Sequence, residues 1–405
     1  MLHIAADHRT LMNDDKPFFY LADTCWSAFT NITDEEWDYY LQFRKTQGFN
    51  TIQINILPQW DASQTSLNYH PFNDGYELND EYFSHAKAMA EKAKTMGFEL
   101  ALVVLWCNYV PDTWASAITN NTLPKEVIKP YVHKVHNTFS HLNPIYVISG
   151  DTDFNTEETT AYYLEAAETL KKLAPQCLFT THIKGRLTQI PPELVSYLDI
   201  IWYQSGHNGE DKGMPYKLAE EMMKYNKPLI NSEPCYEEMG YSRMMYNRWS
   251  RYDVRRAAYM SLLSGACAGI KYGAAGIYNW HKGVERRSSE GFMSPKRVED
   301  ALHLPGAEDY AYIRFLWERY GITQLTPNHD VIDANTDDIR AATDDEHILI
   351  YVPVNCNVRM NIDLNGYNIE AIDLKDRRIM YPLVKDNTLP MTLSHEDTLF
   401  ILTAK

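Results

Sequence analysis

Short apolar segments alternate with amphipathic segments over the first three quarters of the chain. The apolar segments lie at residues 18–24, 51–57, 100–106, 145–151, 178–183, 200–205, 228–234 and 268–273. Because they are continuously apolar rather than alternating, they predict parallel strands in a sheet whose outer face is covered. The segments between them predict helices, most clearly at 33–48, 81–97, 157–174 and 216–226. The first of these carries the signals of a complete helix, with Thr33 as N-cap, an acidic first turn and Gly48 at its end.

This alternation predicts an α/β fold, and more specifically a (β/α)8 barrel, because eight strand–helix units span roughly 300 residues. A doubly wound sheet is the alternative, but no glycine-rich phosphate loop follows the first strand. After a predicted helix at 307–321 the pattern changes to short strands separated by Asn, Asp and Gly turns, the first of them at 329–334. We therefore expect a barrel domain over residues 1–322 and a small antiparallel β-sandwich domain over 323–405.

The composition and charge of the chain limit the kinds of ligand and the location that are expected for it. The 405 residues carry a formal charge of −16, which argues against nucleic acid or an anionic membrane as a ligand. No apolar stretch is long enough to span a bilayer, and the first residues show no basic leader followed by an apolar core. The six cysteines show no C-x-x-C spacing and are expected to be buried free thiols. These features predict a soluble, cytoplasmic protein.

Candidate chemistry lies at the ends of the predicted strands, where barrels of this kind place their functional side chains. Carboxylates and amides hold sugar hydroxyl groups, and indole rings stack on the apolar face of a sugar. The strand ends therefore predict a carbohydrate site. Its candidate substrate-binding residues are Asp23, Trp26, Gln53, Asn55, Trp106, Asn108, His182, Lys184, Tyr203, Gln204, His207 and Trp280.

Two carboxyl groups, Asp151 and Glu233, stand out because each ends a strongly apolar strand. Such a position is partly desolvated, which raises the pKa of a carboxyl group. Cleavage of a glycosidic bond uses two such groups, one protonated at the leaving oxygen and one ionised at the anomeric carbon. The fourth and seventh strands lie across the barrel from each other, so the two groups are expected to converge.

Several alternatives stay open for individual residues. Asp151 follows a glycine and is equally suited to cap the next turn, and Asp153, two residues further on, is a rival for the same catalytic role. Arg256, before the eighth strand, either partners Glu233 or pairs on the outer surface.

Metal chemistry has less support. His133 and His136 are three residues apart on a predicted helix, and they are expected on its outer face. We expect neither a metal nor a cofactor. A metal-dependent hydrolase using His182, His207 or His281 is one alternative function. A non-catalytic carbohydrate-binding protein on a decayed barrel is another, although binding alone requires neither catalytic carboxylate.

The blocks "KPFFYLADTCWSAFTNITDEEWDYYLQFRKTQGFNTIQINIL", "YVISGDTDF", "PLINSEPCYE" and "VRRAAYMSLLSGACAGIKYGAAGIYNW" together resemble the apiosidase-like glycoside hydrolases. The resemblance covers nearly the whole chain. It implies a barrel with a β-sandwich and cleavage with retention. It also implies that Asp151 is the acid/base, Glu233 the nucleophile and Tyr236 part of the sugar pocket.

One departure is Ser149, which stands where the family block usually carries a second glycine. We expect a retaining, exo-acting glycosidase that releases a terminal sugar from a small glycoside or oligosaccharide.

Overall fold

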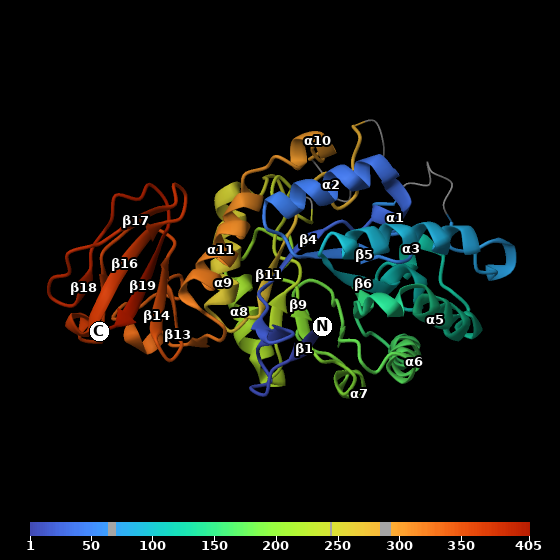
Figure 1. Ribbon diagram of the computed structural model, residues 1–405, viewed down its shortest axis with the longest axis horizontal. Helices are drawn as coiled ribbons and strands as arrows, with labels where there is room; N and C mark the ends of the chain where they lie inside the picture. The colour runs from blue at the N-terminus through green and yellow to red at the C-terminus, as the bar shows by residue number, and fades with distance from the viewer. Residues whose placement is uncertain (64–69, 244, 284–292) are drawn as a thin grey trace.

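The computed structural model describes residues 1–63, 70–243, 245–283 and 293–405. Its centre is an eight-stranded parallel sheet, curled into a nearly closed barrel in the order β8-β7-β6-β5-β4-β11-β10-β9 (Figure 1). The strands are β4 (Tyr20–Thr24), β5 (Thr51–Asn55), β6 (Glu99–Trp106), β7 (Ile145–Gly150), β8 (Phe179–Thr180), β9 (Ile201–Tyr203), β10 (Leu229–Asn231) and β11 (Gly269–Tyr272). The predicted (β/α)8 barrel is thus confirmed, and each predicted strand overlaps an observed one.

The barrel closes between its two shortest strands, β8 and β9. They share no ladder, but the backbone N–H groups of Asp199 and Ile200 both donate to the Phe179 carbonyl, at 2.8 and 3.2 Å. On the opposite side, β11 approaches β4 so closely that a Cβ on Gly269 would lie 2.2 Å from the Tyr20 carbonyl oxygen. Gly269 also has φ of +150°, so this strand contact requires glycine.

Helices on the outside of the barrel connect successive strands (Figure 1). The longer helices are α2 (Asp34–Thr46), α3 (Asp80–Thr95), α5 (Lys125–Phe139), α6 (Glu157–Leu173), α8 (Met214–Met222), α9 (Arg251–Leu262) and α11 (Gly306–Tyr320). The short ones are α1 (Ala28–Asn31), α4 (Ser116–Thr119), α7 (Pro192–Val195) and α10 (Val298–Ala301). Helix α2 begins as expected, because Thr33 and Glu36 exchange side-chain hydrogen bonds in a capping box. Among the described residues, no helix is both long and apolar enough to cross a membrane.

The C-terminal part is an antiparallel β-domain, as predicted. A six-stranded sheet has the order β12-β13-β14-β19-β16-β17, and β15 and β18 form a second, two-stranded layer. The bounds are β12 (Thr326–Pro327), β13 (Arg340–Thr343), β14 (His347–Val352), β15 (Val358–Arg359), β16 (Tyr367–Asp373), β17 (Arg378–Met380), β18 (Thr388–Leu389) and β19 (Thr398–Ala404). The strand predicted at 329–334 is wrong, because His329–Val331 forms a 3-10 helix.

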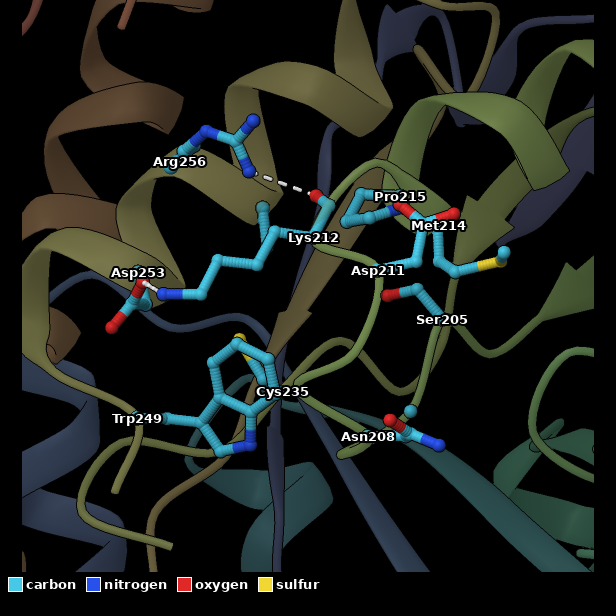
Figure 2. Close-up of a pocket in the computed structure, with 12 residues that line it drawn as sticks. Ser205, Asn208, Asp211, Lys212, Met214, Pro215, Cys235, Trp249, Asp253 and Arg256 are labelled. Carbon is cyan, nitrogen blue, oxygen red and sulfur yellow. Dashed lines mark hydrogen bonds and ion pairs between the residues drawn. The ribbon is translucent and has the colours of Figure 1, made fainter. Parts of the chain in front are cut away.

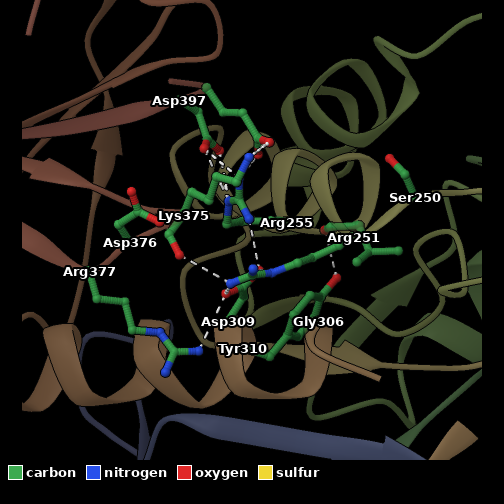
Figure 3. A network of polar contacts seen from close by, with 12 residues as sticks. Ser250, Arg251, Arg255, Gly306, Asp309, Tyr310, Lys375, Asp376, Arg377 and Asp397 are labelled. Atoms are coloured by element: carbon green, nitrogen blue, oxygen red, sulfur yellow. Dashed lines mark hydrogen bonds and ion pairs between the residues drawn. The ribbon is translucent and has the colours of Figure 1, made fainter. Parts of the chain in front are cut away.

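The β-domain packs on the barrel through α9 and α11 (Figure 1). Tyr259 of α9 stacks on Tyr351 of β14, with ring centroids 5.2 Å apart. Beside them, the buried Arg255 guanidinium donates to Asp309 of α11 at 2.8 Å and to Asp397 of the β-domain at 2.6 Å (Figure 3). The two parts therefore share one apolar core and one buried ionic network.

The N-terminal sheet and the cysteines complete the description of the fold. The chain begins with a small antiparallel sheet, β1 (Leu2–Ile4), β2 (Leu11–Asn13) and β3 (Lys16–Pro17), which the sequence pattern did not predict. All six cysteines are free, and all but Cys356 are buried, in agreement with the expectation from their spacing.

Candidate active site

Glu233 lies just beyond the end of β10, where three cationic or protonatable groups surround its carboxylate. Its Oε1 is 2.9 Å from Nε2 of His207, and its Oε2 is 3.3 Å from Nε2 of His182 and 3.6 Å from Nζ of Lys271. Only 12% of the Glu233 side chain is exposed. Burial alone would raise the pKa of Glu233, but the Lys271 ammonium and the two histidines outweigh it and lower that pKa well below its usual range.

His182 is fully buried on the loop after β8 and is held by two neighbours. Its Nδ1 lies 3.1 Å from the Ser232 hydroxyl, and its Nε2 faces Glu233. Burial lowers the pKa of His182, although Glu233 acts in the opposite direction. His182 therefore contacts the Glu233 carboxylate through Nε2, while Ser232, whose hydroxyl donates to the Tyr203 carbonyl at 3.2 Å, lies at Nδ1.

Asp151 follows Gly150 at the end of β7 with φ of +46°, a left-handed conformation that Asp tolerates better than most residues. The Trp114 indole N–H donates to its carbonyl at 2.7 Å, and the Gln204 amide donates to its Oδ1 at 2.5 Å. Burial, together with the nearby Glu233 carboxylate, raises the pKa of Asp151 well above its usual range. The two carboxyl groups therefore have pKa values displaced in opposite directions.

Asp153, the rival to Asp151, is engaged in structural contacts. Its Oδ2 accepts from Nζ of Lys184 at 2.9 Å, and its Oδ1 accepts from the backbone N–H of Trp114 at 3.2 Å. Lys184 thus binds a carboxylate of its own chain, and both residues hold the loop that carries Asp151.

Aromatic rings gather beside these groups. The Trp26 ring lies 5.5 Å from both the Trp106 and the His182 rings, and Trp106 stacks on His182 at 5.9 Å. The indole N–H of Trp26 donates to the Tyr236 hydroxyl at 3.2 Å. A Cβ on Gly150 would lie 2.0 Å from the Trp106 ring, so only glycine at this position leaves room for the ring. The site therefore combines paired carboxyl groups with indole faces.

This combination of carboxyl groups and indole rings agrees with the result of comparing the chain with known protein families. Residues 5–324 match the family described as "Apiosidase-like, catalytic domain". The chain belongs to the apiosidase-like family. It is accordingly a glycoside hydrolase, and the matched residues end in the short connection between α11 and β12.

Solved structures share the whole fold of this apiosidase-like protein. One described as a glycoside hydrolase is 22% identical, covers 100% of this chain and 97% of its own, and has a TM-score of 0.84. A glycoside hydrolase family 5 protein from Bacteroides vulgatus is also 22% identical, covers 100% of this chain and 93% of its own, and has a TM-score of 0.85. At these identities the likeness establishes the fold. No curated protein matches the sequence.

The predicted amides lie at different depths of the apiosidase-like barrel. Asn55 is next to Trp26, since its backbone N–H donates to the Trp26 carbonyl at 3.0 Å. Asn108 is fully buried in the 3-10 helix that directly follows β6. Gln53 lies deeper, inside the barrel, where its amide donates to the Tyr20 hydroxyl at 2.9 Å. Asn55 and Asn108 thus lie at or just beyond the ends of β5 and β6, and Gln53 supports the barrel interior.

Two predicted residues point away from the site. The Asp23 carboxylate is fully buried against α2, where Arg44 donates to it at 2.6 Å and Tyr40 at 2.8 Å. The Tyr203 hydroxyl donates to the Pro215 carbonyl on α8 at 2.8 Å. Side chains alternate between the two faces of a strand, so these strand-end residues face the helices instead of the barrel interior.

Trp280 and His281 are also turned elsewhere. The Trp280 ring packs edge-on against Tyr40 of α2 with centroids 5.7 Å apart, and Nδ1 of His281 lies 3.2 Å from the Lys296 carbonyl. Among the residues that the structure describes, no three His, Cys, Asp or Glu side chains form a metal-binding group.

Lys271 is the residue that sequence reasoning missed. It lies on β11, is fully buried, and donates to the Tyr236 hydroxyl at 2.7 Å. A lysine within the apolar run "AGIKYG" was the available signal. Arg256, the cation considered for this position, instead donates to the Lys212 carbonyl and to Asp338, both at 2.8 Å, on the outer side of α9.

A separate small cavity lies between α8 and α9, behind the strand ends (Figure 2). It is lined in part by Ser205, Lys212, Cys235 and Trp249, and its volume is about 20 Å³. This is room for a single water molecule and excludes a sugar. Glu233 and Asp151 do not line it.

Proposed function

We propose that the protein is a retaining, exo-acting glycoside hydrolase in which Glu233 is the nucleophile and Asp151 the acid/base. The observation that supports this best is the contrast in surroundings. Glu233 lies within 3.6 Å of Lys271 and two histidines, which lowers its pKa, whereas Asp151 is bound by the Gln204 amide with the Glu233 carboxylate nearby, and burial raises its pKa. Paired carboxyl groups divide the two roles in this way, one ionised to attack and one protonated to donate.

In the first step a Glu233 oxygen attacks the anomeric carbon as the bond to the leaving oxygen breaks, and Asp151 gives that oxygen its proton. In the second step Asp151 takes a proton from a water molecule whose oxygen attacks the anomeric carbon. The bond from that carbon to Glu233 breaks, so the sugar leaves and Glu233 is again an ionised carboxylate. Retention requires the two carboxyl groups to lie about 5–5.5 Å apart when substrate is bound.

Exo action on a small glycoside is supported by the low exposure of the nucleophile. With 12% of its side chain exposed, Glu233 is open to a terminal sugar more readily than to the middle of a polymer. The family description makes apiosides the first substrates to test. A cytoplasmic location is supported by the five buried free thiols.

The test is hydrolysis of a panel of aryl glycosides by the wild-type protein, Glu233→Gln and Asp151→Asn. The panel holds apiosides, arabinofuranosides, galactosides, glucosides, xylosides and fucosides. We expect one sugar to be released by wild type with net retention, measured by NMR of the first-formed anomer, and no release by Glu233→Gln.

Release of the opposite anomer would contradict the retaining mechanism. If no glycoside turns over and sugars bind equally to all three proteins, the binding-protein alternative replaces the enzyme.

A further inference from the structure

Lys271 is a cationic side chain that is fully buried within a strand of the barrel. Its side chain is fully inaccessible, in a strand whose other residues are Gly269, Ile270 and Tyr272. Burying an ammonium without a partner is costly, so such a lysine is paired with a specific anion. The nearest carboxylate oxygen is Oε2 of Glu233, at 3.6 Å.

Lys271 also reaches Glu233 through a second group. Its Nζ donates to the Tyr236 hydroxyl at 2.7 Å, and the Trp26 indole donates to the same oxygen at 3.2 Å. With both acceptor positions of the phenol oxygen occupied, its own proton is left to donate to a neighbouring acceptor. Burial and the Glu233 carboxylate raise the pKa of Tyr236 well above its usual range, so this proton stays on the phenol.

The surrounding rings fix the ammonium in place. Nζ of Lys271 lies 3.9 Å from the centre of the Tyr236 ring and 5.5 Å from that of Trp26. Both rings attract a cation through their faces, so Lys271 has one well-defined position beside the carboxylate.

On the basis of the proposed function, we propose that Lys271 is the positioning residue of the nucleophile. It holds Glu233 ionised and oriented, directly through its ammonium and indirectly through the Tyr236 hydroxyl. Lys271 differs from His182, because burial lowers the pKa of His182 from an ordinary value that is already near neutral, whereas the pKa of Lys271 is lowered to about 7 and the side chain carries its positive charge below that pH.

The ionisable groups around this pair set its pH dependence. Those facing Glu233 are His182, His207, Tyr236 and Asp151, and those close to Lys271 besides Glu233 are Asp23 and Cys235. Burial lowers the pKa of Lys271 to about 7, although the Glu233 charge acts to raise it. Removing Lys271 takes away the charge that keeps the pKa of Glu233 low, so the ionisation of Glu233 should move to higher pH.

The first test is the pH profile of kcat/KM for Lys271→Met, with the glycoside that wild type cleaves best. We expect the acidic limb to move up by about one pH unit or more, and kcat to fall by about 10²-fold while KM changes little. Tyr236→Phe should give a smaller shift in the same direction. The matched control is Lys171→Met, which removes a surface lysine of α6 paired with Asp199 and should leave the profile unchanged. An unmoved acidic limb in Lys271→Met, or an equal shift in Lys171→Met, would overturn the proposal.

A second test needs no substrate and so separates this inference from the proposed function. Unfolding in urea is followed for wild type, Lys271→Met, Glu233→Gln and the double variant. If the two charges are coupled, Lys271→Met lowers the midpoint strongly in the wild type and only slightly in the Glu233→Gln background. A Lys271→Met protein that fails to fold while the double variant folds supports the pairing. A double variant as destabilised as the two single changes combined would refute it, whether or not any glycoside is cleaved.

Discussion

At the scale of single residues, the pKa of each carboxyl group in the site depends on the groups that lie next to it. Glu233 faces an ammonium and two imidazoles, whereas Asp151 faces the amide of Gln204 and the carboxylate of Glu233 itself. The same residue type, a carboxylic acid at a strand end, is thereby given pKa values displaced in opposite directions. The roles that we propose for the two groups rest on these neighbours and not on position alone.

The pH dependence of catalysis follows from these two groups. Glu233 must be ionised, and because its pKa is lowered, activity should be lost only as pH falls below the usual carboxylate range. Asp151 must be protonated, and because its pKa is raised, activity should be lost as pH rises through that raised value. In Asp151→Asn we expect a dinitrophenyl glycoside, which needs no acid to leave, to lose the part of the alkaline limb that Asp151 sets, while the acidic limb and the decline set by Lys271, whose pKa is about 7, remain. Initial rates from pH 3 to 10 measure both limbs.

For a glycoside with a poor leaving group, Asp151→Asn should lose about 10²–10⁴-fold in rate, the usual contribution of an acid catalyst. Asn is preferred to Ala in this experiment because the residue is left-handed, and Asn tolerates that conformation. Equal losses for good and poor leaving groups would show that Asp151 is not the acid, and Asp153→Asn would then be the variant to examine.

Some of the residues that the sequence predicts for the site lie there in the structure and others do not, and the difference has a geometric cause. Glu233, His182, His207, Trp26 and Trp106 were identified because a barrel brings strand ends together, and the structure does bring them together. Asp23 and Tyr203 were included by the same rule, yet they lie on the strand face that meets the helices. The face cannot be read from a continuously apolar strand, since both faces are buried and no alternation marks the inside.

At the scale of elements, the register of β6 and β7 builds one wall of the candidate site. Trp106 and Gly150 are paired in this register, so the indole lies over a residue without a side chain. Asp151, the proposed acid, follows Gly150 directly. One strand pair therefore places both an indole and this carboxyl group.

Gly150→Ala tests this arrangement. The added methyl group would lie 2.0 Å from the Trp106 ring, which must move and take its contacts with Trp26 and His182 with it. We expect a loss of about 1–3 kcal/mol of stability from overpacking. We expect a loss of about 10²-fold in kcat/KM from the displaced site.

The control for this change is Gly366→Ala, where a Cβ would meet nothing within 4 Å. It should leave both thermal unfolding and kcat/KM as in wild type. If Gly150→Ala keeps full activity, the Trp106 ring is not part of the substrate surface.

Element lengths were predicted less well than element order. The apolar run at 178–183 gives a strand of only two residues, Phe179–Thr180, because β8 is at the incompletely closed side of the barrel and lacks a ladder with β9. The N-terminal sheet was missed because its strands have two or three residues, which is too short for any period to appear. The order of the strands along the chain was still predicted correctly, because it depends on the number of apolar segments and not on their exact lengths.

At the scale of the whole molecule, one arginine joins three parts of the fold. Arg255 of α9 is 1% exposed and pairs with Asp309 of α11 and Asp397 of the β-domain, both fully buried (Figure 3). Tyr351 of β14 donates to the same Asp397 at 3.0 Å. Asp309 also accepts from Arg251 at 2.6 Å, so the loss of Arg255 would leave Asp397 as the buried carboxylate whose charge is no longer compensated.

We predict that Arg255→Met destabilises the protein by about 3–5 kcal/mol, the cost of removing one partner from a buried ion pair. The neighbouring Arg256 is the matched control, since it pairs with the largely exposed Asp338. Arg256→Met should cost no more than about 1 kcal/mol, as exposed ion pairs do. Urea unfolding followed by far-ultraviolet circular dichroism and by tryptophan fluorescence gives both values. All nine tryptophans lie before residue 323, so fluorescence reports on the barrel, whereas circular dichroism reports on the barrel and the β-domain together.

The two probes also decide whether the β-domain is a structural part of the barrel. If it covers apolar barrel surface, both probes should show one transition in wild type, and removal of residues 323–405 should cause aggregation instead of altered sugar preference. Separate transitions in wild type, or a soluble and active barrel after the deletion, would show that the shared core at Tyr259 and Tyr351 contributes little. The stacked rings and the buried network lie at the same interface, which is why we expect a single cooperative unit.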